Sequence, residues 1–179
     1  MADPTDRDLA IRARRGDAEA LGELVRRYQG SVFNVCYRLL GERREAEDMA
    51  QEAFIRAYQR LDTFDADRLF GPWIRRVAAN ACLNRLHQSA PVDVPLLDEE
   101  RDEDTEGTPE IVHEQTEQAS IVRAAIHSLL PHYRAVIELR HFQEMSYEEI
   151  ATTLNIPTSD VKSHLFRARK LLAEKLGHG

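Results

Sequence analysis

An acidic segment in the middle of the chain separates two stretches of helical periodicity, and this division limits the folds that the chain can adopt. Residues 88–117 hold 11 of the 31 acidic residues and one of the 24 basic residues, so they carry −10 while the rest of the chain carries +3. Prolines and a glycine interrupt the same stretch, and no helical or strand period runs from Ser89 to Pro109. We expect a linker here, which is either a solvated tether or an acidic mimic of nucleic acid that occupies a basic groove on a partner.

The composition favours one or two small helical domains. The 179 residues include only 8 glycines and 7 prolines, which indicates long helices rather than many turns. No apolar run approaches the ~20 residues of a membrane span, and the N-terminus lacks the basic start and apolar run of a secretory signal. Cys36 and Cys82 belong to neither a CxxC motif nor a Cys/His cluster. We therefore expect a cytoplasmic protein with no membrane insertion, no metal and no cofactor.

Four helices are expected in the N-terminal half. The first covers Asp6–Arg15, the second runs from a capping Asp17 to about Gly41, and the third runs from about Arg44 to Leu61. Residues 62–72 form a short loop that contains two aromatics and ends in a Gly-Pro breaker. The fourth helix runs from 73 to 87. Apolar residues recur every three or four positions in these helices, which predicts a small helical bundle.

The third helix has an apolar stripe that includes Tyr58 and an opposite face of mostly polar side chains. The opposite face carries Glu45, Asp48, Gln51, Glu52, Ile55 and Arg56. A solvated helix face has this composition, and so does a docking face whose partner supplies basic residues. The residues alone leave both interpretations open.

The fourth helix has a buried face and a second, largely polar face. Helical spacing brings together Arg76, Asn80, Leu83, Asn84 and His87. Asparagine inside a helix costs about 0.5 kcal/mol relative to alanine. Amide side chains suit base edges and arginine suits phosphates. This face predicts either a nucleic-acid contact or an ordinary polar surface.

The C-terminal half predicts a helix-turn-helix. Helices are expected over 114–128 and from Pro131 to about Phe142, followed by a capping box at Ser146–Glu149. Asn155-Ile156-Pro157 breaks the chain before a last helix over 158–176. A short capped helix, a tight turn and a longer helix form the arrangement that places a recognition helix in the major groove of DNA.

The last helix carries polar and basic side chains around an apolar stripe. They are Lys162, Ser163, His164, Arg167, Arg169 and Lys170. Lys162, Ser163 and Arg167 share the outer side near the amino end, where a recognition helix meets base edges. Arg169 and Lys170 come later in the helix, and they either reach phosphates or pack elsewhere. The pattern predicts binding to duplex DNA, and a helical hairpin with a charged surface is the alternative.

Motifs in both halves resemble those of bacterial sigma factors. The first half carries motifs similar to the first conserved domain of that family, at Glu45–Tyr58, Leu61–Phe64 and Trp73–Asn80. The second half carries motifs similar to the last domain, at Leu130-Pro131, Met145–Ala151 and Val161–Arg169. The short two-domain layout is similar to the extracytoplasmic-function (ECF) class of the sigma-70 family, and the resemblance covers nearly all of the chain except the linker.

The resemblance implies an all-α fold of two small helical domains joined by an acidic flexible linker, the C-terminal one a helix-turn-helix. The N-terminal sigma domain is then expected at residues 1–88, the linker at 89–114 and the C-terminal sigma domain at 115–179. The implied function is not enzymatic. The chain would bind core RNA polymerase, recognise the −35 and −10 promoter elements and promote melting, which starts transcription of a stress or envelope-response regulon.

The same resemblance assigns roles to individual residues. Docking on a coiled coil of the largest polymerase subunit is implied for Asp48, Gln51, Glu52 and Arg56. The polymerase flap is a second implied contact, without assigned residues. Recognition of the −10 element, with a base flipped into a loop pocket, is implied for Phe64, Phe70, Arg76, Asn80 and Asn84. Recognition of the −35 element as duplex is implied for Lys162, Ser163, His164, Arg167 and Arg169. Many relatives are held inactive by an anti-sigma factor, which makes such a protein a candidate partner.

Two other classes of function compete with this interpretation. A stand-alone helix-turn-helix regulator would bind duplex DNA without polymerase and use its N-terminal half as a sensor or dimerisation domain. A helical-bundle metalloenzyme would draw on His113, Glu114 and the carboxylates near Glu45, but the sequence has no paired Glu-x-x-His motifs.

Overall fold

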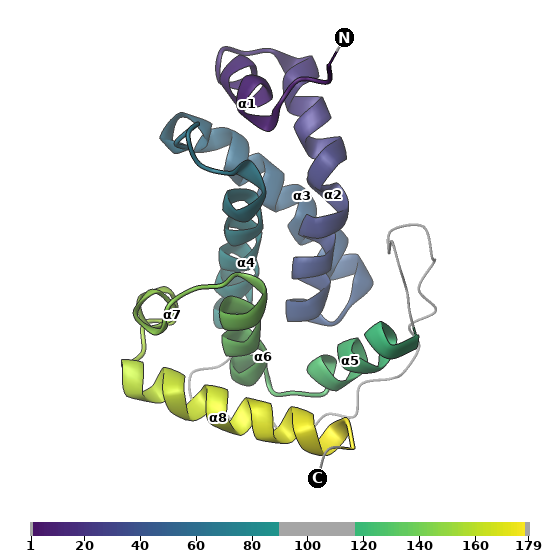
Figure 1. Ribbon diagram of the computed structural model, residues 1–179, viewed down its shortest axis with the longest axis vertical. Coiled ribbons are helices and arrows are strands. Elements are labelled where there is room, and N and C mark those ends of the chain that lie inside the picture. Colours follow the sequence, from purple (N-terminus) through teal and green to yellow (C-terminus); the bar gives the residue numbers. More distant parts are fainter. Residues whose placement is uncertain (1, 90–116, 178–179) are drawn as a thin grey trace.

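The computed structural model describes residues 2–89 and 117–177, and its regular elements there are all helical (Figure 1). The N-terminal cluster contains α1 (Asp6–Arg14), α2 (Ala18–Leu40), α3 (Arg43–Gln59), a short 3₁₀ turn η1 (Leu61–Thr63) and α4 (Phe70–Ser89). The C-terminal cluster contains α5 (Glu117–His127), α6 (Pro131–Ile137), a π-helical turn η3 (Glu138–Phe142), α7 (Tyr147–Leu154) and α8 (Thr158–Lys175). The predicted all-α fold of two clusters is confirmed. Beyond Ser89, the predicted linker over 89–114 lies outside the described residues.

The core of the N-terminal cluster forms where α2, α3 and α4 pack side by side (Figure 1). The completely buried side chains at its centre include Val35, Cys36, Leu39, Ile74 and Cys82. Full burial of an aliphatic side chain of this size stabilises the fold by about 1.5–3 kcal/mol. The predicted cap is confirmed: Asp17 accepts hydrogen bonds from the first-turn amides of α2, and the helix ends at Gly41 with a φ of 75°.

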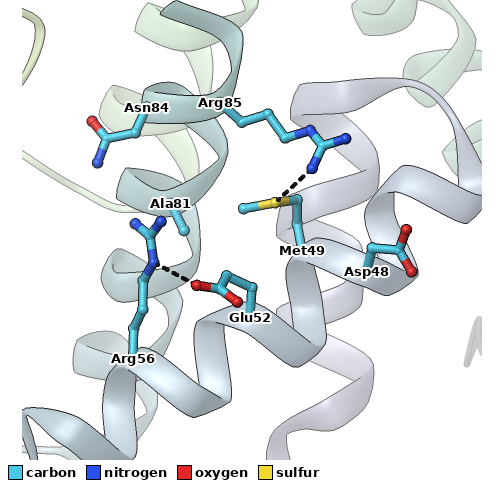
Figure 2. Close-up of a pocket in the computed structure, with 7 residues that line it drawn as sticks. All are labelled: Asp48, Met49, Glu52, Arg56, Ala81, Asn84 and Arg85. Carbon is cyan, nitrogen blue, oxygen red and sulfur yellow. Dashed lines mark hydrogen bonds and ion pairs between the residues drawn. The ribbon is translucent and has the colours of Figure 1, made fainter. Parts of the chain in front are cut away.

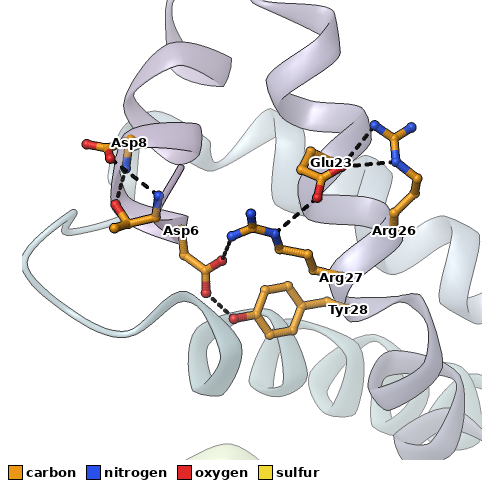
Figure 3. Close-up of polar contacts among 7 residues, drawn as sticks. Asp6, Asp8, Glu23, Arg26, Arg27 and Tyr28 are labelled. Carbon is orange, nitrogen blue, oxygen red and sulfur yellow. Dashed lines mark hydrogen bonds and ion pairs between the residues drawn. The ribbon is translucent and has the colours of Figure 1, made fainter. Parts of the chain in front are cut away.

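Helix α1 is fastened to α2 by a polar network (Figure 3). The Asp6 carboxylate accepts a hydrogen bond from the Tyr28 hydroxyl and another, of 3.0 Å, from Arg27. Arg27 also donates to Glu23 over 3.2 Å. On its other side α1 buries Leu9, Ala10 and Ala13. The network therefore fixes the rotation of α1 on the bundle.

Helix α4 begins earlier than the sequence predicts. The Gly-Pro pair was expected to break the chain before Trp73, but α4 starts at Phe70 and includes both residues in its first turn. Proline is tolerated there because the first-turn amides have no intrahelical partner. Glycine suits position 71, since a Cβ there would make a tight contact of 3.0 Å with Cε1 of Tyr28.

The C-terminal cluster contains the predicted helix-turn-helix, formed by α7 and α8. The capping box of Ser146 and Glu149 is confirmed, and Asn155 takes a left-handed conformation (φ 54°) between the two helices. The π-helical turn after α6 was not predicted. It is closed by the amide of Gln143, which donates to the Glu138 carbonyl over 3.0 Å.

Candidate nucleic-acid interface

The outer face of α4 presents two amides to solvent. Asn80 and Asn84 are exposed and lie one helical turn apart, as their spacing predicts. Arg76, one turn before Asn80, differs: its Nη1 lies 3.5 Å from the carboxylate of Glu149, and its Nη2 donates to the Gln143 carbonyl over 3.4 Å. The structure thus brings the three predicted residues onto one face, with Arg76 held by the C-terminal cluster.

The loop before α4 is built on a buried aromatic cluster. Phe64 and Phe70 are 3% and 4% exposed, and each packs against Trp73 with ring centroids 4.9 Å and 5.6 Å apart. Their rings therefore cannot stack directly on a base while the loop keeps this conformation. The direct DNA role of both residues stays a prediction, and in this conformation both rings lie buried within the aromatic cluster.

Leu69 is a large apolar side chain that this loop exposes, at 77%. Sequence reasoning passed over it, although an apolar residue between Arg68 and Phe70 in a short polar loop was a usable signal. From below, Arg14 of α1 donates to the Phe64 carbonyl over 2.5 Å and links the loop to the N-terminal helix.

The predicted docking face of α3 borders a pocket of about 470 Å³ between α3 and α4 (Figure 2). Its lining residues are Asp48, Met49, Glu52, Arg56, Ala81, Asn84 and Arg85. Within it, Arg56 donates to Glu52 over 3.2 Å, and Arg85 points toward the sulfur of Met49. The pocket therefore joins the predicted polymerase-facing residues to Asn84 of the predicted DNA face.

Two apolar side chains extend the face of α3 that Asp48 and Gln51 share. Ile55 and Tyr58 are each 53% exposed. The exposure of Ile55 agrees with the sequence pattern, whereas the placement of Tyr58 on the buried stripe was wrong because the helix turns its ring away from the core. A half-exposed aliphatic and a half-exposed aromatic are typical of a protein-binding surface.

The outer face of α8 is polar, basic and aromatic. Lys162, Ser163 and Arg167 are exposed, while Val161, Leu165 and Ala168 are buried on the opposite side. Phe166 is 70% exposed beside them. It was not among the predicted residues, although an aromatic four positions after Lys162, outside the apolar stripe, gave the signal. An exposed ring at this place can contact the methyl group of a thymine.

His164 and Arg169 are turned toward the rest of the C-terminal cluster. The ring of His164 is half-buried with its centroid 5.0 Å from that of His132, and its Nδ1 has no hydrogen-bond partner. Arg169 is exposed, but its Nε donates to Nε2 of His141 over 3.2 Å. Burial, and secondarily the Arg169 charge, lowers the pKa of His141, so its ring is neutral and able to accept this bond.

Among the described residues, no group of three or more His, Cys, Asp or Glu side chains is placed to hold a metal ion. Of the helices in this part of the chain, none combines the length and the apolar character that a bilayer crossing requires.

Comparison with known proteins matches both halves to one family. Residues 24–91 match Sigma-70 region 2, and residues 119–172 match Sigma-70, region 4. The chain is 35% identical to the ECF RNA polymerase sigma factor SigW of Bacillus subtilis, over 91% of this chain and 92% of that protein. It is also 35% identical to the ECF RNA polymerase sigma-E factor of Escherichia coli K12, over 96% of this chain and 94% of that one.

The chain belongs to the ECF class of the sigma-70 family. Sigma factors are non-catalytic initiation factors, so the prediction that the chain is not an enzyme is confirmed. This sigma factor initiates transcription through promoter recognition. The stand-alone regulator and the metalloenzyme are therefore set aside.

Two solved structures resemble this sigma factor with a TM-score of 0.56 each. One is CnrH in complex with the cytosolic domain of CnrY, 27% identical, which covers 96% of this chain and 97% of that chain. The other is the sigma factor RpoE in complex with the anti-sigma factor NepR from Bartonella quintana. It is 16% identical and covers 87% of this chain and 96% of that chain, so it supports the fold alone.

Proposed function

We propose that this sigma factor uses three helix faces, one for each of three binding functions. The face of α3 docks on core RNA polymerase, the face of α4 with its preceding loop captures the opened −10 element, and the outer face of α8 binds the −35 element as duplex. The observation that carries the proposal is that each domain exposes one face suited to nucleic acid. These faces are formed by Asn80 and Asn84 on α4, and by Lys162, Ser163 and Arg167 on α8.

Capture of a flipped base explains how the −10 contact drives melting without ATP. Unstacking a base costs a few kcal/mol, which hydrogen bonds to the base edge and apolar contact with its ring offset. In this proposal Asn80 and Asn84 supply the amides, and Leu69 supplies apolar contact at the loop. Phe64 and Phe70 hold the loop in shape from beneath. Because these contacts form only with unpaired bases, binding favours the open duplex.

The contact with the −35 element uses the ordinary rules of the major groove. Arg167 suits guanine or phosphate, Lys162 suits phosphate, and Ser163 can bond to several bases. Phe166 adds an apolar surface beside them. We assign His164 and Arg169 to support of α8, through His132 and His141 respectively, with Arg169 also within reach of backbone phosphates.

The docking face on α3 combines charge with exposed apolar surface. Asp48, Gln51, Glu52 and Arg56 surround Ile55 and Tyr58, and a partner helix with basic residues would match this composition. The coiled coil of the largest polymerase subunit is the partner implied by the family, with the flap as a second contact for the C-terminal domain. The functional units are then residues 1–88 and 115–179, joined by 89–114.

We further infer an anti-sigma protein as a regulatory partner, a cytoplasmic location without membrane insertion, and a regulon concerned with stress or the cell envelope. The complex of the relative CnrH with a cytosolic domain of another protein supports a protein regulator of this kind.

Run-off transcription with core polymerase tests the proposed function. On a genomic fragment library, addition of the chain should produce discrete transcripts that core polymerase alone does not make. Unaided binding to specific duplex DNA, with no gain of initiation in the presence of core, would contradict the proposal.

A further inference from the structure

Helix α1 contacts the loop before α4, residues 64–69, at its first residue and at its tip. The helix lies at the end of the bundle where α3 and α4 meet, and it packs against η1 and the start of α4 (Figure 1). Arg14 of α1 donates to the Phe64 carbonyl over 2.5 Å. At the tip of the loop, Arg7 of α1 lies 3.4 Å from the carboxylate of Asp67. The loop is therefore fastened to a helix 50 residues earlier in the chain.

The end of the loop rests on α1 through one intermediate side chain. The ring of Tyr28 packs on Phe70, the first residue of α4, with centroids 5.3 Å apart. The hydroxyl of Tyr28 donates to Asp6 of α1 (Figure 3). Both ends of the loop are thus held with respect to the same helix.

The two direct contacts from α1 differ in strength. The side chains of Arg7 and Asp67 are 63% and 83% exposed, and exposed ion pairs contribute little to stability. The contact of Arg14 with the Phe64 carbonyl is partly buried and has a charged donor. Hydrogen bonds of this kind are shorter and stronger than those between neutral groups. Arg14 therefore provides most of the direct support.

Helix α1 is itself held firmly, so it can fix the position of Arg14. Its amino end is closed by a capping box between Thr5 and Asp8, and one side of the helix is buried in the core of the bundle. The network of Asp6 with Arg27 and Tyr28 fixes its rotation. Arg14 is the last residue of α1, which places its guanidinium at the edge of this fixed helix.

The tip of the loop is closed by hydrogen bonds of its own. The Asp65 carboxylate accepts from the Asp67 amide over 3.0 Å, and the Asp65 carbonyl accepts from the Arg68 amide over 2.9 Å. These bonds join the residues of the tip to one another, and Leu69 follows them, 77% exposed. The direction in which the tip points therefore depends on how the loop is held at Phe64, directly before Asp65.

We propose that Arg14 is a positioning residue for base capture, which holds the loop in the orientation that receives an unpaired base. The inference rests on the proposed function, in which this loop and the face of α4 capture the opened −10 element. A loop that is already ordered loses less conformational entropy on binding, which raises affinity. A binding site must also be held within about 0.5 Å of its productive geometry. Arg14 therefore affects both promoter opening and the choice of base, through the Phe64 carbonyl.

Replacement of Arg14 tests this role in the complete holoenzyme. Arg14→Ala leaves the Phe64 carbonyl without this donor and should reduce promoter opening about tenfold, the factor that corresponds to one hydrogen bond with a charged donor. Permanganate reactivity of thymines measures opening on a promoter that gives a run-off transcript. Closed binding, measured by band shift on ice, should stay unchanged, because it precedes base capture.

The choice of base separates positioning from a loss of folded protein. The captured position is defined as the −10 position at which base substitution lowers opening by the wild-type holoenzyme most. The ratio of opening on the best base to opening on the worst base at this position should fall severalfold in Arg14→Ala. A smaller amount of folded protein would lower opening on every promoter by the same factor, which leaves this ratio unchanged.

Two further variants provide a rescue and a matched control. Arg14→Lys keeps a charged donor from which a single carbonyl can accept, and it should restore most of the opening and of the ratio. Arg12→Ala removes another arginine from the last turn of α1, one that pairs with Asp17 over 2.9 Å. It makes the same change of charge and should leave the ratio unchanged. Thermal melting by circular dichroism shows that each variant remains folded.

An unchanged ratio in Arg14→Ala, no recovery in Arg14→Lys, or an equal loss in Arg12→Ala would overturn the positioning role and leave the proposed function intact. Failure of the proposed function has a different signature. The wild-type holoenzyme would then open no promoter, or would discriminate among bases at no −10 position, and both proposals would be overturned.

Discussion

Tyr28 connects the N-terminal helix to the start of α4. Its hydroxyl donates to Asp6 of α1, and its ring packs on Phe70 with centroids 5.3 Å apart. The edge of the same ring would lie 3.0 Å from a Cβ at position 71, which is a glycine. Burial, with a contribution from the hydrogen bond to Asp6, raises the pKa of Tyr28 to about 12. The neutral hydroxyl is therefore the form that the folded chain favours.

The raised pKa predicts that Tyr28 ionises at a higher pH than an ordinary tyrosine. The difference between the wild-type and Tyr28→Phe titrations at 295 nm should have its midpoint near pH 12, above the ordinary tyrosine value of about 10. Because the folded pKa is raised, the associated stabilisation is complete below pH 10 and is lost as the pH rises through 12. A midpoint near pH 10 would contradict the burial and the Asp6 contact.

Asn80 tests the −10 contact at the level of one side chain. Asn80→Ala should reduce promoter opening about fivefold, the effect of one hydrogen bond worth about 1 kcal/mol, with little change in initial closed binding. Permanganate reactivity of thymines measures opening, and band shift on ice measures closed binding. An equal loss in both measurements, or normal melting, would argue against base capture by this amide.

At the residue scale, the sequence predicted which side chains lie on exposed helix faces better than which side chains are buried by contacts between helices. Asn80, Asn84, Lys162 and Arg167 lie on outer faces because helical spacing alone sets the face of each side chain. The burial of Phe64 could not be predicted, because it depends on rings contributed by α4, which a local pattern does not contain.

The helical elements were largely predictable, and the exceptions have identifiable causes. The capping residues Asp17 and Ser146 are visible in the sequence because their side chains act within one turn. The start of α4 was missed because proline is both a helix breaker and a favoured first-turn residue. The π turn at Glu138–Phe142 was missed because its buried carboxylate is stabilised by an arginine of the other domain.

The Ser146 cap of α7 should contribute measurably to the free energy of unfolding of the helix-turn-helix. Ser146→Ala removes the acceptor for the Glu149 amide and should lower the free energy of unfolding by about 1 kcal/mol in urea titration. Ser159→Ala, in the exposed first turn of α8, should change the free energy by less than about 0.5 kcal/mol. Equal effects of the two variants would show that the cap does not contribute.

The face of α3 predicts a polymerase contact that depends on charge. Asp48→Lys should weaken association with core polymerase about tenfold, because it juxtaposes like charges with a basic partner surface. Affinity pull-down with immobilised core measures the effect, and Glu19→Lys on α2 is the control with the same charge change. Unchanged pull-down of Asp48→Lys would place the polymerase contact elsewhere.

At the scale of the whole molecule, the division into two helical clusters followed from the sequence, but their mutual packing did not. Helical periods and the acidic, proline-containing middle are local features, whereas the contact of Arg38 with Glu138 joins residues 100 positions apart. A single sequence carries no signal that pairs these two charges among many others.

The central claim is that the two domains bind separate promoter segments only when the chain is bound to core polymerase. Footprinting on a linear promoter fragment tests this claim most directly. With core and the sigma factor together, we predict protection of both the −35 and −10 segments and permanganate-reactive thymines within the −10 segment, without ATP. The sigma factor alone should protect neither segment. Protection of duplex by the sigma factor alone, or a holoenzyme complex without reactive thymines, would contradict the account.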